Sequence, residues 1–244
     1  MLRFTVILSC VCALFTSCAE QCNIAGNSSV GSLDGQMLYL RVSNDGVTPV
    51  SIDSCEVIHG RFNFYFDMDS VRVAQLCMRG ENVMPVVLEG GNLRVQVDHS
   101  GQRVSGGPFN DRLYRFIQRK NRLENEQWEL DLKCLRMMRE GRSSEDINNT
   151  IGPKARRLAK KVENLETDFI MDNYDNPLGT GAFMLLFSQY PLPIMTDQIR
   201  RIVNRAPESF MRDPFVNSYV RRARLNAKIA AGRNGEGIID GEKE

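Results

Sequence analysis

The stretch from Pro85 to Phe116 constrains the fold most, because the spacing of its hydrophobic residues changes partway along. Val86–Leu88 lead into a glycine-containing turn, and apolar and polar residues alternate from Leu93 to Val97, as in β-strands. Gly106–Pro108 ends this alternation, and from Phe109 onward apolar residues recur at helical spacing. The sequence therefore predicts β structure before this point and α structure after it.

Before this point, short segments of strand character are separated by turn-forming residues such as Gly, Asn and Asp. They are residues 23–27, 37–42, 50–58, 61–66, 72–78, 83–88, 92–97 and 103–105. Phe62, Phe64 and Phe66 share one strand face at period two, whereas Asn63 and Tyr65 occupy the other. We expect the phenylalanine face to be buried. Strands of this length and spacing predict an antiparallel β-sandwich of seven or eight strands, or an open barrel, rather than βαβ units.

After Phe109 the pattern predicts a long helix that ends at Gly141. Its expected apolar stripe consists of Phe109, Leu113, Phe116, Ile117, Leu123, Leu130, Leu135 and Met138. Ser143–Asp146 has the composition of a helix N-cap, and Pro153 is expected in the first turn of the main second helix, which runs to about Asn173.

Three further helices are expected. Residues 181–189 are apolar on every side and should form the most buried helix. Helices over 196–204 and from 213 to about 232 complete the set. We therefore assign the fold class α+β, with residues 1–17 as a signal peptide, 18–106 as the β-sandwich, 107–232 as the helical domain and 233–244 as a flexible tail.

The N-terminal residues predict that the protein is exported to the cell envelope. Met1–Arg3 carries a positive charge, Phe4–Phe15 is apolar but too short to span a bilayer, and the small residues Thr16 and Ser17 precede Cys18. This arrangement resembles a lipobox, which implies cleavage before Cys18 and acylation of its thiol. The alternative is plain secretion with cleavage elsewhere. We expect the mature protein to be a lipoprotein that is held at the membrane by acyl chains such as palmitate.

Charge is divided unevenly along the chain, although the net charge is only +1. Residues 1–105 hold seven Arg, no Lys and ten acids, whereas residues 106–229 hold 22 Lys or Arg and 16 acids. A basic helical region suits an anionic partner or a membrane surface, but these bases alternate with Glu and Asp, as on a solvated helix face. We therefore favour the solvated face and expect no nucleic-acid partner.

Four cysteines follow Cys18, namely Cys22, Cys55, Cys77 and Cys134. None belongs to a C-x-x-C pair, in which one thiolate attacks a disulfide and its neighbour resolves the intermediate. Dithiol redox catalysis is therefore disfavoured. A disulfide between Cys55 and Cys77 remains open, and buried free thiols are the alternative.

A family resemblance spans residues 22–116. It is carried by the runs CNIAGNSS, DGQMLYLRV, IDSCEVIHGRFNFYF, VMPVVLEGGNLRVQVD and VSGGPFNDRLYRF. These resemble the domain of unknown function 4369, found in Bacteroidetes lipoproteins ahead of a thioredoxin-like (AhpC/TSA) thiol-disulfide oxidoreductase domain. The resemblance implies the fold and an outer-membrane lipoprotein, periplasmic or surface-facing. The C-x-x-C of the thioredoxin-like domain is missing from this sequence.

Candidates for chemistry are few. His59 and His99 lie in turns without clustered metal-binding partners, and no nucleophile elbow, Walker loop or dinucleotide fingerprint is present. We therefore assign no catalytic residue, metal or cofactor. Ser70, in Asp69-Ser70-Val71, resembles the O-glycosylation acceptor of the same bacterial group, with a plain turn as the alternative. Trp128 is expected to be a packing anchor in its helix.

These observations predict a non-enzymatic envelope lipoprotein whose β-sandwich binds a ligand, a glycan or a protein. The alternative is an accessory or partner of a thioredoxin-like oxidoreductase, which would dock with it or offer Cys55, Cys77 or Cys134 as a substrate thiol.

Overall fold

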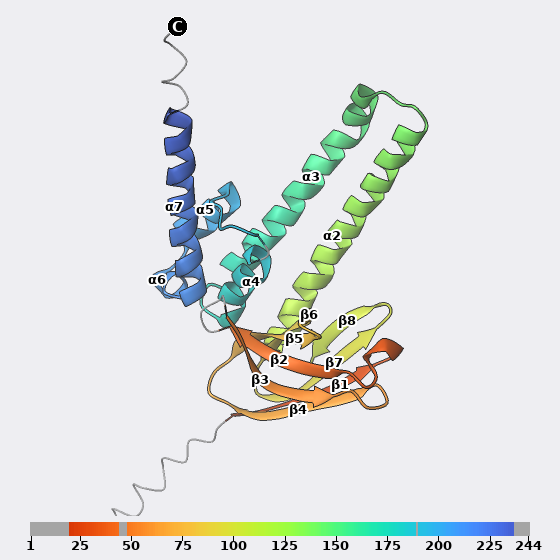
Figure 1. Ribbon diagram of the computed structural model, residues 1–244, viewed down its shortest axis with the longest axis vertical. Coiled ribbons are helices and arrows are strands. Elements are labelled where there is room, and N and C mark those ends of the chain that lie inside the picture. The colour runs from red at the N-terminus through yellow and green to blue at the C-terminus, as the bar shows by residue number, and fades with distance from the viewer. Residues whose placement is uncertain (1–19, 44–47, 189, 237–244) are drawn as a thin grey trace, which may run out of the picture.

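The computed structural model describes residues 20–43, 48–188 and 190–236. Within them, eight strands form two sheets, and a set of helices packs against one side of these sheets (Figure 1). The α+β class predicted from the sequence is confirmed. The expected signal peptide, Cys18 and residues 237–244 of the expected tail lie outside the described residues.

The strands pair in two four-stranded sheets, with orders β4-β1-β7-β8 and β3-β2-β5-β6. Their bounds are β1 (Glu20–Ser28), β2 (Met37–Ser43), β3 (Pro49–Glu56), β4 (Arg61–Met68), β5 (Arg72–Met78), β6 (Glu81–Leu88), β7 (Gly91–Asp98) and β8 (Gly101–Ser105). All eight expected strands are confirmed. The pairing is antiparallel except between β1 and β7, which run parallel, and β1 lies between β4 and β7.

The sandwich core consists of the inward-facing side chains of both sheets. Ile24 and Leu93 come from the first sheet and Leu40 and Leu76 from the second, and all four are buried in one cluster. Phe64 is 1% exposed in the same cluster. The expected burial of the phenylalanine face is therefore confirmed for Phe62 and Phe64, whereas Phe66 is half-buried against the same cluster.

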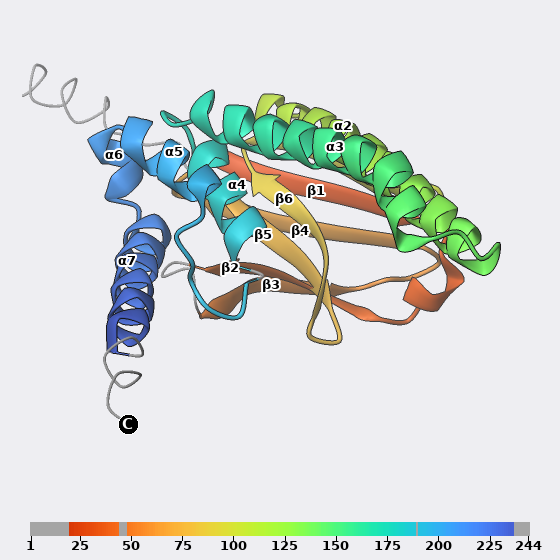
Figure 2. The same ribbon diagram turned by 90° about the horizontal axis from the view of Figure 1, so that it is seen from above.

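The helices form a long hairpin and a compact group beside it. Their bounds are α2 (Pro108–Arg139), α3 (Ser144–Met171), α4 (Pro177–Phe187), α5 (Asp197–Arg205), α6 (Glu208–Met211) and α7 (Pro214–Glu236), and a short 3₁₀ turn, η1 (Gly31–Leu33), precedes β2. In both ribbon views, α2 and α3 lie side by side (Figure 2). Seven of the 11 residues of α4 are buried, so it is the most buried of these helices, as expected, although it begins at Pro177 rather than at 181. The helix α7 runs four residues beyond the expected end at 232.

The helical core is continuous with the outer face of the second sheet. Phe183 of α4 and Phe210 of α6 are buried in one cluster with Val73 of β5 and Val87 of β6. A Cβ atom on Gly181 would lie 2.2 Å from a methyl group of Val73, so α4 can approach β5 this closely only with glycine there. The helices therefore pack directly on the sandwich.

Pro153 lies inside α3, so its expected position in a first turn is wrong. The helix begins nine residues earlier at Ser144, and the Ser143 hydroxyl caps it by accepting from the N–H of Asp146 at 3.1 Å. Proline forfeits one helical hydrogen bond. Since Ile147 and Ile151 are both buried just before it, packing offsets that loss and the helix continues.

The apolar stripe expected along α2 is correct only near its start. Leu113 and Phe116 are buried, and Leu123 and Leu130 are half-buried. Leu135 and Met138, expected on the same stripe, are exposed. In this half of α2 the half-buried residues follow a coiled-coil spacing of four and three, 123, 127, 130, 134 and 137, which fits packing against α3 alone.

A buried polar contact joins the sandwich to α2. Glu89, the residue after β6, accepts hydrogen bonds from the backbone N–H groups of Phe109 at 3.0 Å and Asn110 at 2.8 Å, and from Nδ2 of Asn110 at 2.7 Å. The Asn110 amide also pairs with both backbone groups of Val87, at 2.7 and 2.9 Å. The carboxylate therefore satisfies the free N–H groups at the start of α2, where negative charge is favoured.

Gly107 makes room for this contact. A Cβ atom at that position would lie 2.2 Å from Cδ of Glu89, so any other residue would displace the carboxylate. The turn at Gly106–Pro108, which ends the strand pattern in the sequence, therefore also leaves the space that the Glu89 carboxylate occupies.

We expect Phe64→Ala to lower the free energy of unfolding by about 3 to 5 kcal/mol, because it removes a fully buried ring from the sandwich core. Tyr65→Ala is the matched control, since Tyr65 follows on the same strand but is 61% exposed. Urea denaturation measures both. Equal losses for the two variants would contradict the assignment of the buried face.

We expect Glu89→Ala to destabilise the protein by about 3 kcal/mol, because it leaves buried N–H donors at the start of α2 without an acceptor. Glu81→Ala, at the exposed start of the same strand, is the control and should change stability little. Thermal unfolding followed by circular dichroism compares them. A Glu89 variant as stable as the control would show that the junction does not depend on this carboxylate.

Candidate functional site

The candidate site is a cleft of about 760 Å³ between α2 and α3. It is lined by Arg112, Arg115, Phe116, Arg119, Arg122 and Leu123 of α2, by Lys161, Asn164, Leu165, Asp168 and Phe169 of α3, and by Asp172 just after α3. Five of these residues are cations and two are acids, so the lining carries a net charge of +3.

The cations converge because of their spacing. Arg112, Arg115, Arg119 and Arg122 are separated by three, four and three residues, which places all four on one side of a helix. Lys161 faces them from α3, because the two helices of the hairpin lie side by side (Figure 2). The long guanidinium and ammonium groups therefore surround one opening.

The floor of the cleft is apolar. The rings of Phe116 and Phe169 stack with their centroids 4.1 Å apart and an interplanar angle of 14°. Leu123 and Leu165 extend this surface along the two helices. The cleft therefore combines a non-polar base with a positively charged rim, and this chemistry suits a ligand that has both an apolar part and an anionic group.

The positive charge of the rim exceeds the negative charge of the two acids that line the cleft. Arg112 donates from Nη1 to Oδ1 of Asn173 at 2.9 Å, which leaves its charge uncompensated. Across residues 20–43, 48–188 and 190–236, no ion pair involves any of the five cations. Their positive charge therefore remains available to an outside anion.

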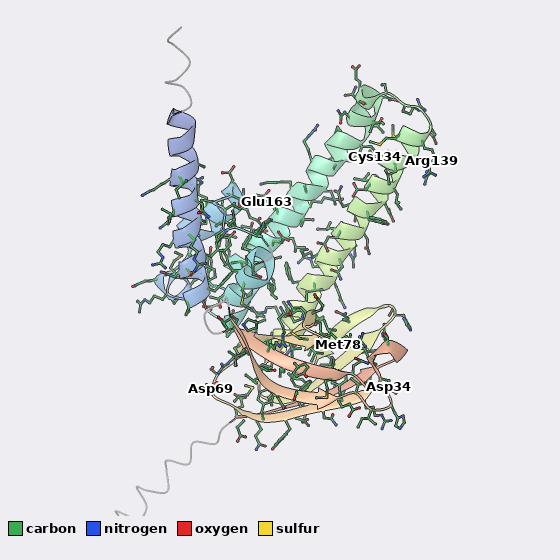
Figure 3. The ribbon with its side chains drawn as sticks, viewed as in Figure 1. Asp34, Asp69, Met78, Cys134, Arg139 and Glu163 are labelled. Atoms are coloured by element: carbon green, nitrogen blue, oxygen red, sulfur yellow. The ribbon has the colours of Figure 1, made fainter. Side chains whose placement is uncertain are left out.

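The opposite side of the hairpin is different. Glu163 of α3 pairs with Arg201 of α5 and with Lys160, and its side chain is labelled in Figure 3. Burial opposes ionisation of Glu163, but hydrogen bonds from Arg201 and Lys160 hold its pKa below the ordinary value. Lys120 likewise pairs with Glu124. This side of the hairpin is closed by internal contacts, whereas the cleft is not.

This cleft differs from the sequence-based prediction, in which the basic residues of the helices belong to a solvated face interleaved with acids. The arginines of α2 are spaced by three, four and three residues, and no acid lies on the same helical face from Arg112 to Arg122. This spacing is the feature of the sequence that indicates a basic surface. The position of Lys161 could not be predicted from a helical pattern, because it depends on how α3 packs against α2.

Ser70, the possible glycosylation site, lies in the exposed turn between β4 and β5. Its hydroxyl donates to Oδ1 of Asp69 at 3.1 Å and accepts from Nη2 of Arg72 at 3.2 Å. Hydrogen bonds from Arg72 and Ser70 lower the pKa of Asp69. These contacts describe an ordered surface turn, and modification of Ser70 stays a prediction.

The disulfide left open between Cys55 and Cys77 does not form. Cys55 pairs with Leu38 across one edge of β2 and Cys77 pairs with Tyr39 across the other. Two strand spacings separate them by about 10 Å, beyond the roughly 7 Å that a disulfide can bridge. Adjacent positions on β2 also direct the two thiols to opposite faces of the sheet.

The thiols are poorly suited to attack. Burial raises the pKa of Cys22 and of Cys55 to about 11, and it also raises that of Cys77. Because the thiolate is the reactive form, these groups are protonated and unreactive near neutral pH. Cys134 is half-buried in the distal part of α2 (Figure 3).

Other candidate residues also have clear positions. His59 lies in a tight turn with Gly60, where both residues have positive φ values of 51° and 72°. Trp128 is 63% exposed, so its expected role as a packing anchor is wrong: beyond Leu123, α2 packs only through its side toward α3, and Trp128 lies off that side.

The described residues offer neither a metal-binding cluster nor a membrane-spanning helix. No group of three or more His, Cys, Asp or Glu side chains is arranged there to hold a metal ion. Among the helices of that part, none is both long and apolar enough to cross a membrane.

Comparison with known proteins bears on the β-sandwich. No curated protein matched the chain. Residues 22–113 match the family described as Domain of unknown function (DUF4369), from β1 through all later strands to the second turn of α2. Of the arginines on the cleft rim, only Arg112 lies within this match. The match to this family therefore covers the β-sandwich and the start of α2, and most of the helical region lies outside it.

Proposed function

We propose that the protein is a non-enzymatic binding module of the cell envelope and that the basic cleft between α2 and α3 holds an anionic ligand. The observation that carries this proposal is the convergence of five cations, none in an ion pair within the described chain, on one cleft. Isolated surface cations are common, but clustered ones repel each other unless an anion offsets their charge.

The dimensions and chemistry of the cleft support a ligand of modest size. Its volume of about 760 Å³ lies within the range of small-molecule sites. Arginine binds carboxylate, sulfate and phosphate groups with two parallel hydrogen bonds, and four arginines on one helix suit several such groups in a row. The stacked Phe116 and Phe169 suit a non-polar part of the same ligand. An acidic oligosaccharide or a short acidic peptide has this chemistry.

We expect the protein to bind dextran sulfate or polyglutamate, but not neutral dextran, in a salt-dependent manner. Replacing Arg115 and Arg119 together by Glu should weaken binding by about tenfold or more, because two charge-assisted contacts become repulsive. Titration calorimetry measures the affinities.

The matched control replaces Arg221 and Arg224 of α7 by Glu. It makes the same change of charge on another exposed helix and should preserve most of the affinity. If both double variants bind equally well, binding follows overall charge and the cleft is not the site. If sulfated and carboxylated polymers bind differently, the preference separates an acidic glycan from an acidic peptide as the natural ligand.

The proposal places the protein at a membrane through acyl chains on Cys18. Its support lies in the sequence, where the apolar stretch 4–15 and two small residues precede this cysteine. The strand β1 begins at Glu20, two residues later, so an acylated Cys18 would hold the sandwich within about 7 Å of its own lipid.

We expect the wild-type protein to partition into the detergent phase of a Triton X-114 extraction and Cys18→Ser to move to the aqueous phase, because two acyl chains give stable membrane attachment. Cys22→Ser, four residues further on, is the control and should stay with the detergent. Unchanged partition of the Cys18 variant would refute the anchor without affecting the cleft.

The buried thiols give less support to the alternative role as a partner in thiol-disulfide exchange. Of the thiols that this role could use, Cys55 and Cys77 have pKa values raised by burial, so both are protonated near neutral pH and exchange slowly.

A further inference from the structure

The outer side of α2 carries a row of exposed apolar residues, away from both the cleft and α3. Trp128, Leu132, Leu135 and Met138 follow one another at intervals of four, three and three, so they form a stripe on one side of the helix. Each exposes 43% or more of its surface. An apolar stripe of this kind on a charged helix is typical of an interaction surface.

The charges around this apolar stripe change sign at its middle. Residues 124–131 contain four acids and no base, whereas residues 132–139 contain three bases and no acid. Two copies of this segment packed antiparallel would set each acidic block against the basic block of the other copy. Parallel packing would set like charges together, which is unfavourable.

We propose that the apolar stripe is a self-association surface on which two copies of this chain pair through antiparallel α2 helices. With the twofold axis between Asp131 and Leu132, Trp128 of one copy packs near Leu135 of the other. Glu129 lies on the same flank as Arg136, so it approaches Arg136 of the second copy within about one helical turn. Tryptophan and arginine at such positions often dominate association energies.

The same features disfavour two other binding partners for the apolar stripe, a membrane surface and an unrelated protein. A membrane surface rich in anionic lipid would be repelled by the four acids of residues 124–131. An unrelated protein partner would need a matching reversal of charge, whereas a second copy supplies it by symmetry. Neither Glu129 nor Arg136 forms an ion pair within the described chain, so both are available.

The experiment uses protein produced from the full-length sequence and two readouts. Sedimentation velocity over a concentration series measures mass, and fluorescence measures the environment of Trp128, which is the only tryptophan in the chain. We expect the mass to rise from monomer to dimer with concentration and the emission to shift to shorter wavelength over the same range, because the exposed indole becomes buried.

Leu135→Asp should abolish both changes. Its matched control is Leu225→Asp on α7, since the two leucines are exposed to almost the same degree, 56% and 57%. The control should dimerise like the wild type. Because both positions are exposed, neither substitution should prevent folding, and circular dichroism verifies this.

Charge reversal tests the antiparallel arrangement. Glu129→Lys or Arg136→Glu alone should weaken dimerisation, and the double variant should restore it, because each exchanged charge again meets its opposite. A protein that stays monomeric at millimolar concentration would overturn the proposal. A dimer that Leu135→Asp leaves unchanged, or that the double charge reversal does not rescue, would also overturn it.

Discussion

The contact between Glu89 and Asn110 determines how the two halves of the structure are joined. Glu89 directly follows β6, an edge strand, and its carboxylate lies at the start of α2. The side-chain amide of Asn110 pairs with the backbone of Val87 much as a neighbouring strand would. Since both side chains are buried and fully bonded, the direction in which α2 leaves the sheet is tightly specified.

The organisation of the helices follows from that direction. As α2 leaves the sheet, its first turns bury Leu113 and Tyr114 against the strands, and the Tyr114 hydroxyl donates to the carbonyl of Pro85 at 2.8 Å. Beyond these turns, α3 is the main partner of α2. The two remaining sides of α2 carry different chemistry: the arginines 112–122 open onto the cleft, and the apolar stripe from Trp128 faces outward. One helix thus presents two separate surfaces.

Local patterns in the sequence predicted most of the sandwich. Alternation identified every strand, and the phenylalanines at 62 and 64 are buried as their spacing required. The pairing of β1 between β4 and β7 could not be obtained in this way, because the parallel contact joins Cys22 to Gly91, far apart in the chain. The role of Glu89 could not be predicted either, since nothing in the neighbouring residues reveals that α2 begins beside it.

The helices were less predictable, for a physical reason. Pro153 normally indicates a helix start, but burial of the preceding isoleucines outweighs the lost hydrogen bond. Leu135 and Trp128 were assigned to a core because apolar residues usually bury themselves, yet the hairpin offers them no partner within the described chain. The cleft depends on packing between two helices. The spacing of the arginines on α2 can be found in the sequence, but the residues that α3 contributes cannot.

The length of α2 has a mechanical consequence. Its 32 residues span about 48 Å, and only the first turns rest on the sandwich (Figure 1). The contacts of Glu163 with Arg201 brace α3 partway along, and the end near Arg139 extends beyond them (Figure 3). A tilt of about 5° at the base would move that end by about 4 Å. Small rotations at the base of the hairpin are thus amplified at its far end. The stiffness of the contact between Glu89 and Asn110 therefore limits how far that end moves.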